Sequence, residues 1–118
     1  MCVLTPGQYP NHRRREVDDS IRRGTKFVTK VQREDGSWYG SWAICFTYGT
    51  WFGVECMMAT GADPESAPVL KAMRFLLDHQ NADGGWGESY LSCVTRKYSK
   101  NVKEGCVCVV INCLLTSI

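Results

Sequence analysis

Apolar side chains recur at three- and four-residue spacings in two separate stretches of the chain. The recurring positions are Ile21, Gly24, Phe27, Val28 and Val31 in the first stretch, and Val69, Ala72, Met73 and Leu76 in the second. Such spacing lines up apolar side chains along one side of an α-helix, whereas a strand would need alternation. Each stretch therefore predicts an amphipathic helix.

Capping residues indicate where these two helices start and end. Asp63-Pro64 offers an N-cap side chain followed by a first-turn proline, so we expect the second helix to start there. The first helix is expected to start near Asp18 or Asp19. Both helices are expected to stop at an aspartate-glycine pair, Asp35-Gly36 in the first and Asp83-Gly84 in the second.

A third helix is predicted between these two, from Thr47 to Thr60. This segment is apolar on nearly all sides and Gly61 follows it as a stop, so we expect a helix that is buried on most sides. Gly49 and Gly53 each cost about 1 kcal/mol relative to alanine inside a helix. Their presence indicates close packing against the helix or an adjacent cavity.

The first amphipathic helix and the loop after it occur twice. The pattern Arg23-Gly24-x-x-Phe27-Val28-x-x-x-Gln32-x-x-Asp35-Gly36-Ser37-Trp38 returns as Lys71-Ala72-x-x-Phe75-Leu76-x-x-x-Gln80-x-x-Asp83-Gly84-Gly85-Trp86. Every matched position is displaced by 48 residues, as from Gln32 to Gln80. A constant displacement that includes a rare tryptophan indicates one structural unit used twice.

The composition excludes some classes of function but does not identify one. A length of 118 residues with 44% hydrophobic residues fits one globular domain. The net charge of +2 comes largely from the basic run at residues 12–15, which acidic residues follow directly, so we expect no nucleic-acid partner. The longest apolar run, near Val107 to Leu115, is too short to span a membrane.

The cysteines predict neither disulfides nor a metal site. Their number, 7, is odd, and their positions form no paired Cys-x-x-Cys motif, which favours a reducing compartment. Cys45 and Cys56 are expected to be small buried apolar groups. Both histidines lie far from the Cys106–Cys108 pair in sequence, so we expect no zinc site. We also expect His79 to complement the dipole at a helix end.

The repeated pattern of basic residue, small residue, aromatic residue, glutamine, glycine and tryptophan resembles the QW motif of squalene and oxidosqualene cyclases. Residues 35–53 and 83–93 resemble the eukaryotic oxidosqualene cyclases, among them lanosterol, cycloartenol and amyrin synthases. The resemblance covers residues 13–100, whereas 1–12 and 101–118 match no segment of that family. It implies an all-α fold, a partial α/α barrel with two outer/inner helix repeats.

The resemblance also implies roles for individual residues. Six of them would be structural, because the motif ties one helix end to the next helix start: Gln32, Gly36, Trp38, Gln80, Gly84 and Trp86. Trp51 aligns with a cavity tryptophan whose indole face stabilises carbocations, although plain core packing is the alternative. Tyr48, three positions earlier, is a second cavity candidate, whereas Phe52 is expected to point elsewhere.

By resemblance, the parent enzyme cyclises 2,3-oxidosqualene to a sterol or triterpene skeleton, an isomerase reaction that uses no cofactor. The family's general acid is the central aspartate of an Asp-Cys-Thr-Ala-Glu motif, which this chain lacks. We therefore assign no catalytic residue and expect the chain to be inactive alone; Asp35 and Asp83 are expected to be turn residues. The parent family is intracellular, at the endoplasmic reticulum membrane or lipid droplets, and this segment carries no membrane attachment.

Two other functions remain open from the sequence. A non-catalytic helical-repeat module would bind a lipid or a protein through an uncovered apolar face. A prenyltransferase-like α/α toroid would need zinc ligands that the spacing does not supply. Because two repeats leave apolar faces uncovered, we expect marginal stability alone and hypothesise a partial gene model or a truncated paralogue.

Overall fold

The structure is a computed structural model that describes residues 13–41 and 44–101. Four helices occupy these ranges: α1 (Arg14–Val31), α2 (Cys45–Ala59), α3 (Ala67–Asp78) and the short α4 (Leu91–Thr95). The same ranges contain no strand, only isolated bridges between Gln80 and Trp86 and between Glu88 and Lys100. The helical prediction is confirmed there. The expectations for residues 1–12 and for the tail after Asn101 lie outside the described residues.

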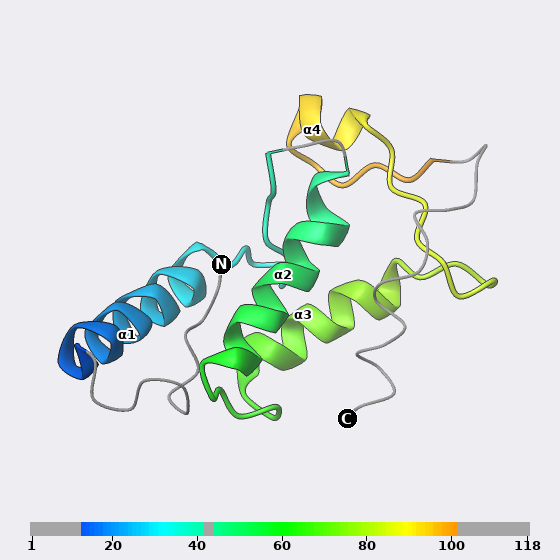
Figure 1. The fold of residues 1–118 in the computed structure, drawn as a ribbon. Coiled ribbons are helices and arrows are strands. Elements are labelled where there is room, and N and C mark those ends of the chain that lie inside the picture. The colour runs from blue at the N-terminus through cyan, green and yellow to red at the C-terminus, as the bar shows by residue number, and fades with distance from the viewer. Residues whose placement is uncertain (1–12, 42–43, 102–118) are drawn as a thin grey trace.

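Helix α2 lies at the centre of the arrangement (Figure 1) and contacts each of the other three helices. Its buried residues are Cys45, Phe46, Thr47, Thr50, Gly53, Val54 and Met57. They recur at helical spacing, so one broad side of α2 faces the core. The opposite side is open, because Phe52 is 53% exposed and Glu55 is also exposed. Burial is therefore less complete than the apolar sequence predicts.

Two small clusters of buried side chains form the core. The first consists of Cys45, Phe46, Phe75, Leu76 and Trp86, and the second of Trp38, Val54 and Ala72. Each cluster contains one tryptophan of the repeated pattern together with residues from α2 and α3. Helix α1 contributes no fully buried residue. Its half-buried Val28 packs against the second cluster, whereas Phe27 is 64% exposed.

Both predicted helix starts are wrong. Helix α1 begins at Arg14, where the amides of Glu16 and Val17 both donate to the carbonyl of Arg13 at 3.0 Å. Asp18 lies in the second turn and pairs with Arg14 at 3.8 Å, so it forms an ion pair within the helix and caps nothing.

Helix α3 begins at Ala67 rather than at Asp63-Pro64. The Asp63 side chain accepts from the amide of Glu65 at 3.0 Å and so closes a turn that precedes the helix. Pro68, in the first turn of α3, is the proline that the helix start uses. Two candidate prolines four residues apart carry the same local signal, and the sequence pattern selected the wrong one.

The two predicted stops also fall too late. Helices α1 and α3 end at Val31 and Asp78, and the glycines Gly36 and Gly84 instead take φ angles of +90° and +83° in the loops that follow. The predicted end of α2, at Thr60, lies one residue beyond the observed end at Ala59, and Gly61 follows with φ +79°.

The amides of Gly61 and Ala62 end α2 by donating to the carbonyls of Met58 and Met57, both at 3.0 Å. This pair of bonds is the Schellman arrangement that a glycine with positive φ permits. Among the described residues, no helix combines the length and apolarity needed to cross a membrane.

Candidate functional site

The two glutamine–tryptophan loops have the same internal geometry. We call residues 32–38 loop 1 and residues 80–86 loop 2. Gln32 Nε2 donates to the carbonyl of Gly36 at 2.9 Å, and Gln80 Nε2 donates to the carbonyl of Gly84 at 2.8 Å. Each glutamine thus closes its own loop onto the glycine four residues later.

The tryptophans bond back to the preceding helix in the same way in both copies. Trp38 Nε1 donates to the carbonyl of Val28 and Trp86 Nε1 to that of Leu76, both at 2.8 Å. Each indole thus bonds to a carbonyl in the last turn of the preceding helix while its ring fills the core, and the Leu76 carbonyl also accepts from the amide of His79 at 3.3 Å. The exposed fractions are 6% for Trp38 and 2% for Trp86.

A tight turn inside each loop brings the glutamine and the tryptophan together. The amide of Arg33 donates to the carbonyl of Ser37 at 2.9 Å, and the amide of Asn81 donates to that of Gly85 at 2.8 Å. Asp35 and Asp83 each accept, at 2.9 Å, from the amide two residues later. Both aspartates are therefore turn residues, as expected.

Loop 1 makes a further contact that loop 2 does not repeat. Gln32 Nε2 also donates to the carbonyl of Pro68 in the first turn of α3, at 2.8 Å. The backbone of Gly36 lies so close to α3 that a Cβ there would overlap the carbonyl of Lys71. Loop 1 consequently connects the end of α1 to the start of α3.

Close packing explains both glycines inside α2. A Cβ at Gly53 would overlap the ring of Trp38, and one at Gly49 would lie 2.6 Å from the Trp38 carbonyl oxygen. Of the two alternatives raised by the sequence, close packing and a cavity, the structure shows the first at both positions. Trp38 of loop 1 therefore packs directly against the two glycines of α2.

Trp51, the cavity candidate, belongs to a group of three aromatic rings on α2. Its ring centroid lies 4.5 Å from that of Phe52, and the rings of Tyr48 and Phe52 lie 5.9 Å apart. Phe52 thus joins the other two rings, contrary to the expectation that it points elsewhere. Trp51 is half-buried, and its indole N–H is buried with no hydrogen-bond partner among the described residues.

Glu88 is a buried acid that the sequence analysis did not single out. It is 4% exposed, and its carboxylate accepts from the amides of Phe46, at 2.9 Å, and Thr47, at 2.7 Å, and from the Thr47 hydroxyl, also at 2.7 Å. These amides belong to the first turn of α2, where a negative charge complements the helix dipole. No periodicity marks Glu88, because it lies in an irregular segment after loop 2.

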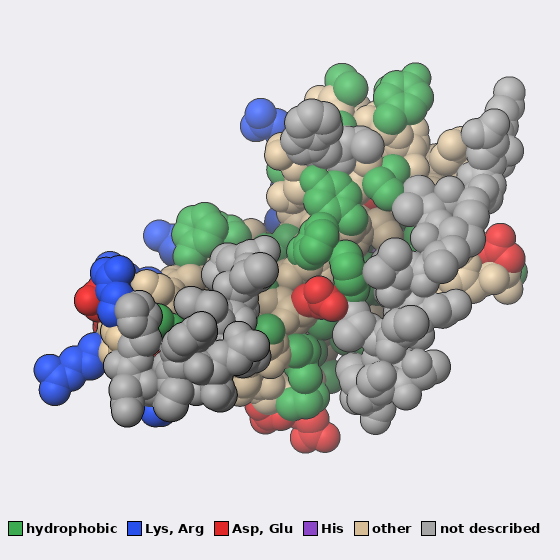
Figure 2. Space-filling model, in the orientation of Figure 1, with side chains coloured by type: hydrophobic (Ala, Val, Ile, Leu, Met, Phe, Trp, Pro, Cys, Tyr) green, Lys and Arg blue, Asp and Glu red, His purple; other side chains and the backbone are tan. Residues whose placement is uncertain are grey.

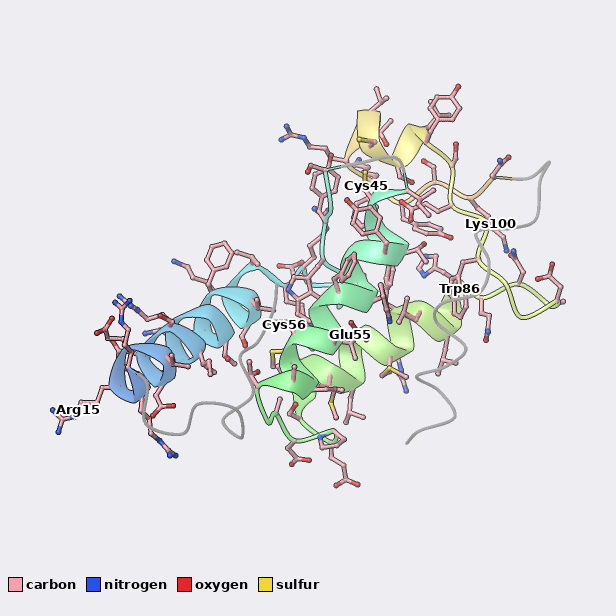
Figure 3. The ribbon with its side chains drawn as sticks, viewed as in Figure 1. Arg15, Cys45, Glu55, Cys56, Trp86 and Lys100 are labelled. Carbon is pink, nitrogen blue, oxygen red and sulfur yellow. The ribbon has the colours of Figure 1, made fainter. Side chains whose placement is uncertain are left out.

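Two groups near Glu88 hold their protons more tightly than usual. Burial, followed by a hydrogen bond to Cys93 and then by charge effects that include Glu88, raises the pKa of Cys45 to about 11. Burial and the charge of Glu88 raise the pKa of Tyr98 to about 12. Cys45, beside α4 at the start of α2 (Figure 3), is thus a buried neutral thiol, as expected for a packing residue.

His79, which was expected at a helix end, is the C-cap of α3. Its Nδ1 lies 2.7 Å from the carbonyl of Phe75, and its ring lies 4.0 Å from that of Tyr98. The side chain therefore stacks over the end of α3. Across the described ranges, no three His, Cys, Asp or Glu side chains are grouped so that they could hold a metal ion.

Comparison with known proteins shows which family this chain resembles. The sequence profile described as the squalene-hopene cyclase C-terminal domain matches residues 7–108, a range that includes both loops and α2. Human lanosterol synthase is 47% identical over 101 residues, which cover 82% of this chain and 14% of that enzyme. Cycloartenol synthase from Dictyostelium discoideum is 57% identical over 90 residues, covering 75% of this chain and 13% of the relative.

A third relative, alpha-onocerin synthase from Lycopodium clavatum, is 46% identical over 92 residues, which cover 77% of this chain and 12% of that enzyme. The chain thus spans about one-seventh of the length of the curated relatives that it matches. A profile match over most of the chain, with two glutamine–tryptophan loops of identical geometry inside it, shows that the chain belongs to the squalene-hopene and oxidosqualene cyclase C-terminal domain family.

Proposed function

We propose that this chain is a part of the catalytic α/α barrel of an oxidosqualene cyclase, in which residues 13–100 supply parts of two consecutive outer/inner helix repeats. In this arrangement α1 and α3 are outer helices and α2 is the inner helix between them. The six loop residues Gln32, Gly36, Trp38, Gln80, Gly84 and Trp86 hold neighbouring repeats together. The substrate of the complete enzyme is 2,3-oxidosqualene, and the product is a sterol or triterpene skeleton.

The aromatic face of α2 is the observation that carries this proposal. Trp51, Tyr48 and Phe52 place three rings side by side on the helix, away from the two buried clusters. Aromatic faces attract cations by about 2 kcal/mol or more where water is excluded, which suits a wall that shelters carbocations. The chain supplies this wall and no general acid, because no Asp-Cys-Thr-Ala-Glu motif occurs in it.

A chimera tests the proposal directly. Residues 13–100 replace the matching segment of human lanosterol synthase, and the purified chimera is incubated with labelled 2,3-oxidosqualene. We expect cyclised product from the chimera, a small loss with Trp51→Phe and a loss of about 30-fold with Trp51→Ala, the factor that corresponds to about 2 kcal/mol. A folded chimera that forms no product, or equal rates in all three proteins, would contradict the proposed cavity role.

The isolated chain provides the complementary measurement. We expect no turnover of labelled 2,3-oxidosqualene by the 118-residue chain, because the acid that starts the reaction is not among its residues. Product formation by the isolated chain would refute this part of the proposal.

A second candidate is a non-catalytic module that binds a lipid or a protein. It is favoured by the uncovered aromatic side chains Phe27 and Phe52, which are 64% and 53% exposed. Saturable binding of 2,3-oxidosqualene by the isolated chain, together with an inactive chimera, would favour this candidate over the cyclase wall.

A further inference from the structure

Two cysteines occupy equivalent positions in the two repeats. The displacement of 48 residues that relates Gln32 to Gln80 also relates Cys45 to Cys93. Cys45 is the first residue of α2, and Cys93 lies in the middle of α4, the short helix that follows loop 2. The repeat therefore places one thiol at each of these two helices.

The two cysteines meet where α4 packs against the start of α2. Cys45 is 0% exposed in the first buried cluster, and Cys93 packs against that cluster. The Cys45 thiol is hydrogen-bonded to Cys93. The Tyr39 hydroxyl donates to the Cys93 carbonyl at 3.2 Å and lies 3.9 Å from Cys93 Sγ, which fixes Cys93 beside Cys45. Both cysteines are thiols in the structure, and every residue of this contact belongs to the described part of the chain.

The two thiols differ in their access to solvent. Cys45 is fully buried, and burial is the largest cause that raises its pKa to about 11, so it is a neutral thiol shielded from reagents in solution. Cys93 is partly exposed. A reagent from solvent therefore meets Cys93 first, and Cys45 is placed to attack the modified Cys93. An accessible thiol beside a second, resolving thiol is the arrangement of reversibly oxidised cysteine pairs.

The charge around Cys93 favours an anionic reagent. Arg96, Lys97 and Lys100 are exposed and form no ion pair within the described ranges. No aspartate or glutamate occurs from residue 89 to residue 101. Figure 2 shows apolar and basic side chains on the surface over α4. Positive charge beside the accessible thiol raises the rate of encounter with an anion, and salt screens this effect.

We propose that Cys45 and Cys93 form a site of reversible oxidation, at which an anionic small-molecule disulfide such as oxidised glutathione links the two residues covalently. In the first step the Cys93 thiolate attacks oxidised glutathione, so that one glutathione becomes bonded to Cys93 Sγ and the other leaves as a thiolate. In the second step Cys45 Sγ loses its proton to solvent, attacks Cys93 Sγ and displaces the bound glutathione. Two protein thiols are oxidised, and one oxidised glutathione is reduced to two thiols. This inference does not depend on cyclase activity.

The bond joins α2 to α4 and encloses α3 and loop 2 between its ends. A covalent link of this kind restricts the unfolded chain and so stabilises the folded one. Oxidation should therefore stabilise the contact between the two repeats, and reduction should reverse the effect.

The experiment exposes the full chain to a series of ratios of oxidised to reduced glutathione. Remaining thiols are alkylated, the chain is digested without reduction, and the peptides are mapped by mass spectrometry. We expect a cross-linked pair of peptides containing Cys45 and Cys93, which dithiothreitol separates. We also expect the urea midpoint to rise by about 1 M or more on oxidation. A folded chain without this cross-link, or one in which Cys93 pairs preferentially with Cys56, would overturn the proposal.

Serine variants test the order of the two steps. Cys45→Ser should leave Cys93 as a stable mixed disulfide with glutathione, because no second thiol resolves it. Cys93→Ser should leave Cys45 unmodified and abolish the rise in the urea midpoint. Cys56→Ser is the matched control on α2 and should retain both the cross-link and the rise. Circular dichroism verifies that the variants keep their helices. Modification of Cys45 in folded Cys93→Ser at the rate seen for Cys93 would overturn the proposed order.

The salt dependence of the first step tests the charge of the reagent. In Cys45→Ser, the rate at which oxidised glutathione modifies Cys93 should fall as salt is added, because salt screens the attraction to the nearby basic residues. Cystamine, a cationic disulfide, should show the opposite trend. Lys97→Glu should slow the reaction with oxidised glutathione at low salt. The same salt dependence for both reagents would refute the preference for an anionic disulfide.

Discussion

Glu88 Oε2 accepts hydrogen bonds from both the backbone amide and the side-chain hydroxyl of Thr47, each at 2.7 Å. The two residues are 41 positions apart in the chain. Helix α2 has no side-chain cap of its own, because its N-cap residue is Ile44. A residue from the segment after loop 2 therefore supplies the cap, and the first turn of α2 depends on tertiary structure.

Removal of this carboxylate should destabilise the chain more than removal of an exposed one. We expect Glu88→Ala to lower the free energy of unfolding by about 2–3 kcal/mol, because it leaves buried amides at the start of α2 without an acceptor. Glu55→Ala removes an exposed carboxylate from the same helix and should change stability by no more than about 0.5 kcal/mol. Urea unfolding of both variants measures the difference. Equal effects would contradict the capping role of Glu88.

Glycine-to-alanine substitutions in α1 and α2 should have opposite effects on the free energy of unfolding. At Gly53 the added methyl group overlaps the Trp38 ring, so we expect a loss of about 1–3 kcal/mol from overpacking. At Gly24 nothing lies within 4 Å of the added methyl group, so the higher helix propensity of alanine should stabilise the chain by up to about 1 kcal/mol. Thermal and urea unfolding measure both effects. A stabilising Gly53→Ala would refute the contact between α2 and loop 1.

The sequence predicted the elements whose signals are local and repeated. Helical spacing located the three long helices, and the repeat at 48 residues related Gln32 to Gln80 before any geometry was known. Helix starts were mispredicted because an aspartate that could cap a helix, Asp63, closes a preceding turn instead. The role of Glu88 could not be predicted, because its acceptor atoms meet donors from a segment about 40 positions earlier and no local pattern records such a contact.

The two glutamines allow a comparison of one residue type in two settings. Gln32→Ala removes two hydrogen bonds, to Gly36 and Pro68, whereas Gln80→Ala removes only the bond to Gly84. With about 1 kcal/mol for each bond, we expect losses of about 2 kcal/mol and about 1 kcal/mol, respectively. The measurement is urea unfolding of both variants. A larger loss at position 80 would contradict the difference between the loops.

Alkaline pH should destabilise the fold through Cys45 and Tyr98. Burial first, and then neighbouring groups that include Glu88, raise the pKa of Cys45 from 9.0 to about 11 and that of Tyr98 from 10.0 to about 12. Between the ordinary and the raised pKa, the unfolded chain releases a proton that the folded chain retains. The stabilisation is therefore fully present below pH 9.0 and decreases as the pH rises toward 11 and 12.

Urea unfolding as a function of pH, under reducing conditions, measures this loss. Cys45→Ala should flatten the decline between pH 9.0 and about 11, and Tyr98→Phe should flatten it between pH 10.0 and about 12. At neutral pH, Tyr98→Phe should cost little, because the Tyr98 hydroxyl is buried with no partner in the described part of the chain. Tyr90→Phe is the matched control, since Tyr90 is 72% exposed. If Tyr98→Phe and Tyr90→Phe give the same decline, burial of Tyr98 does not cause the alkaline loss.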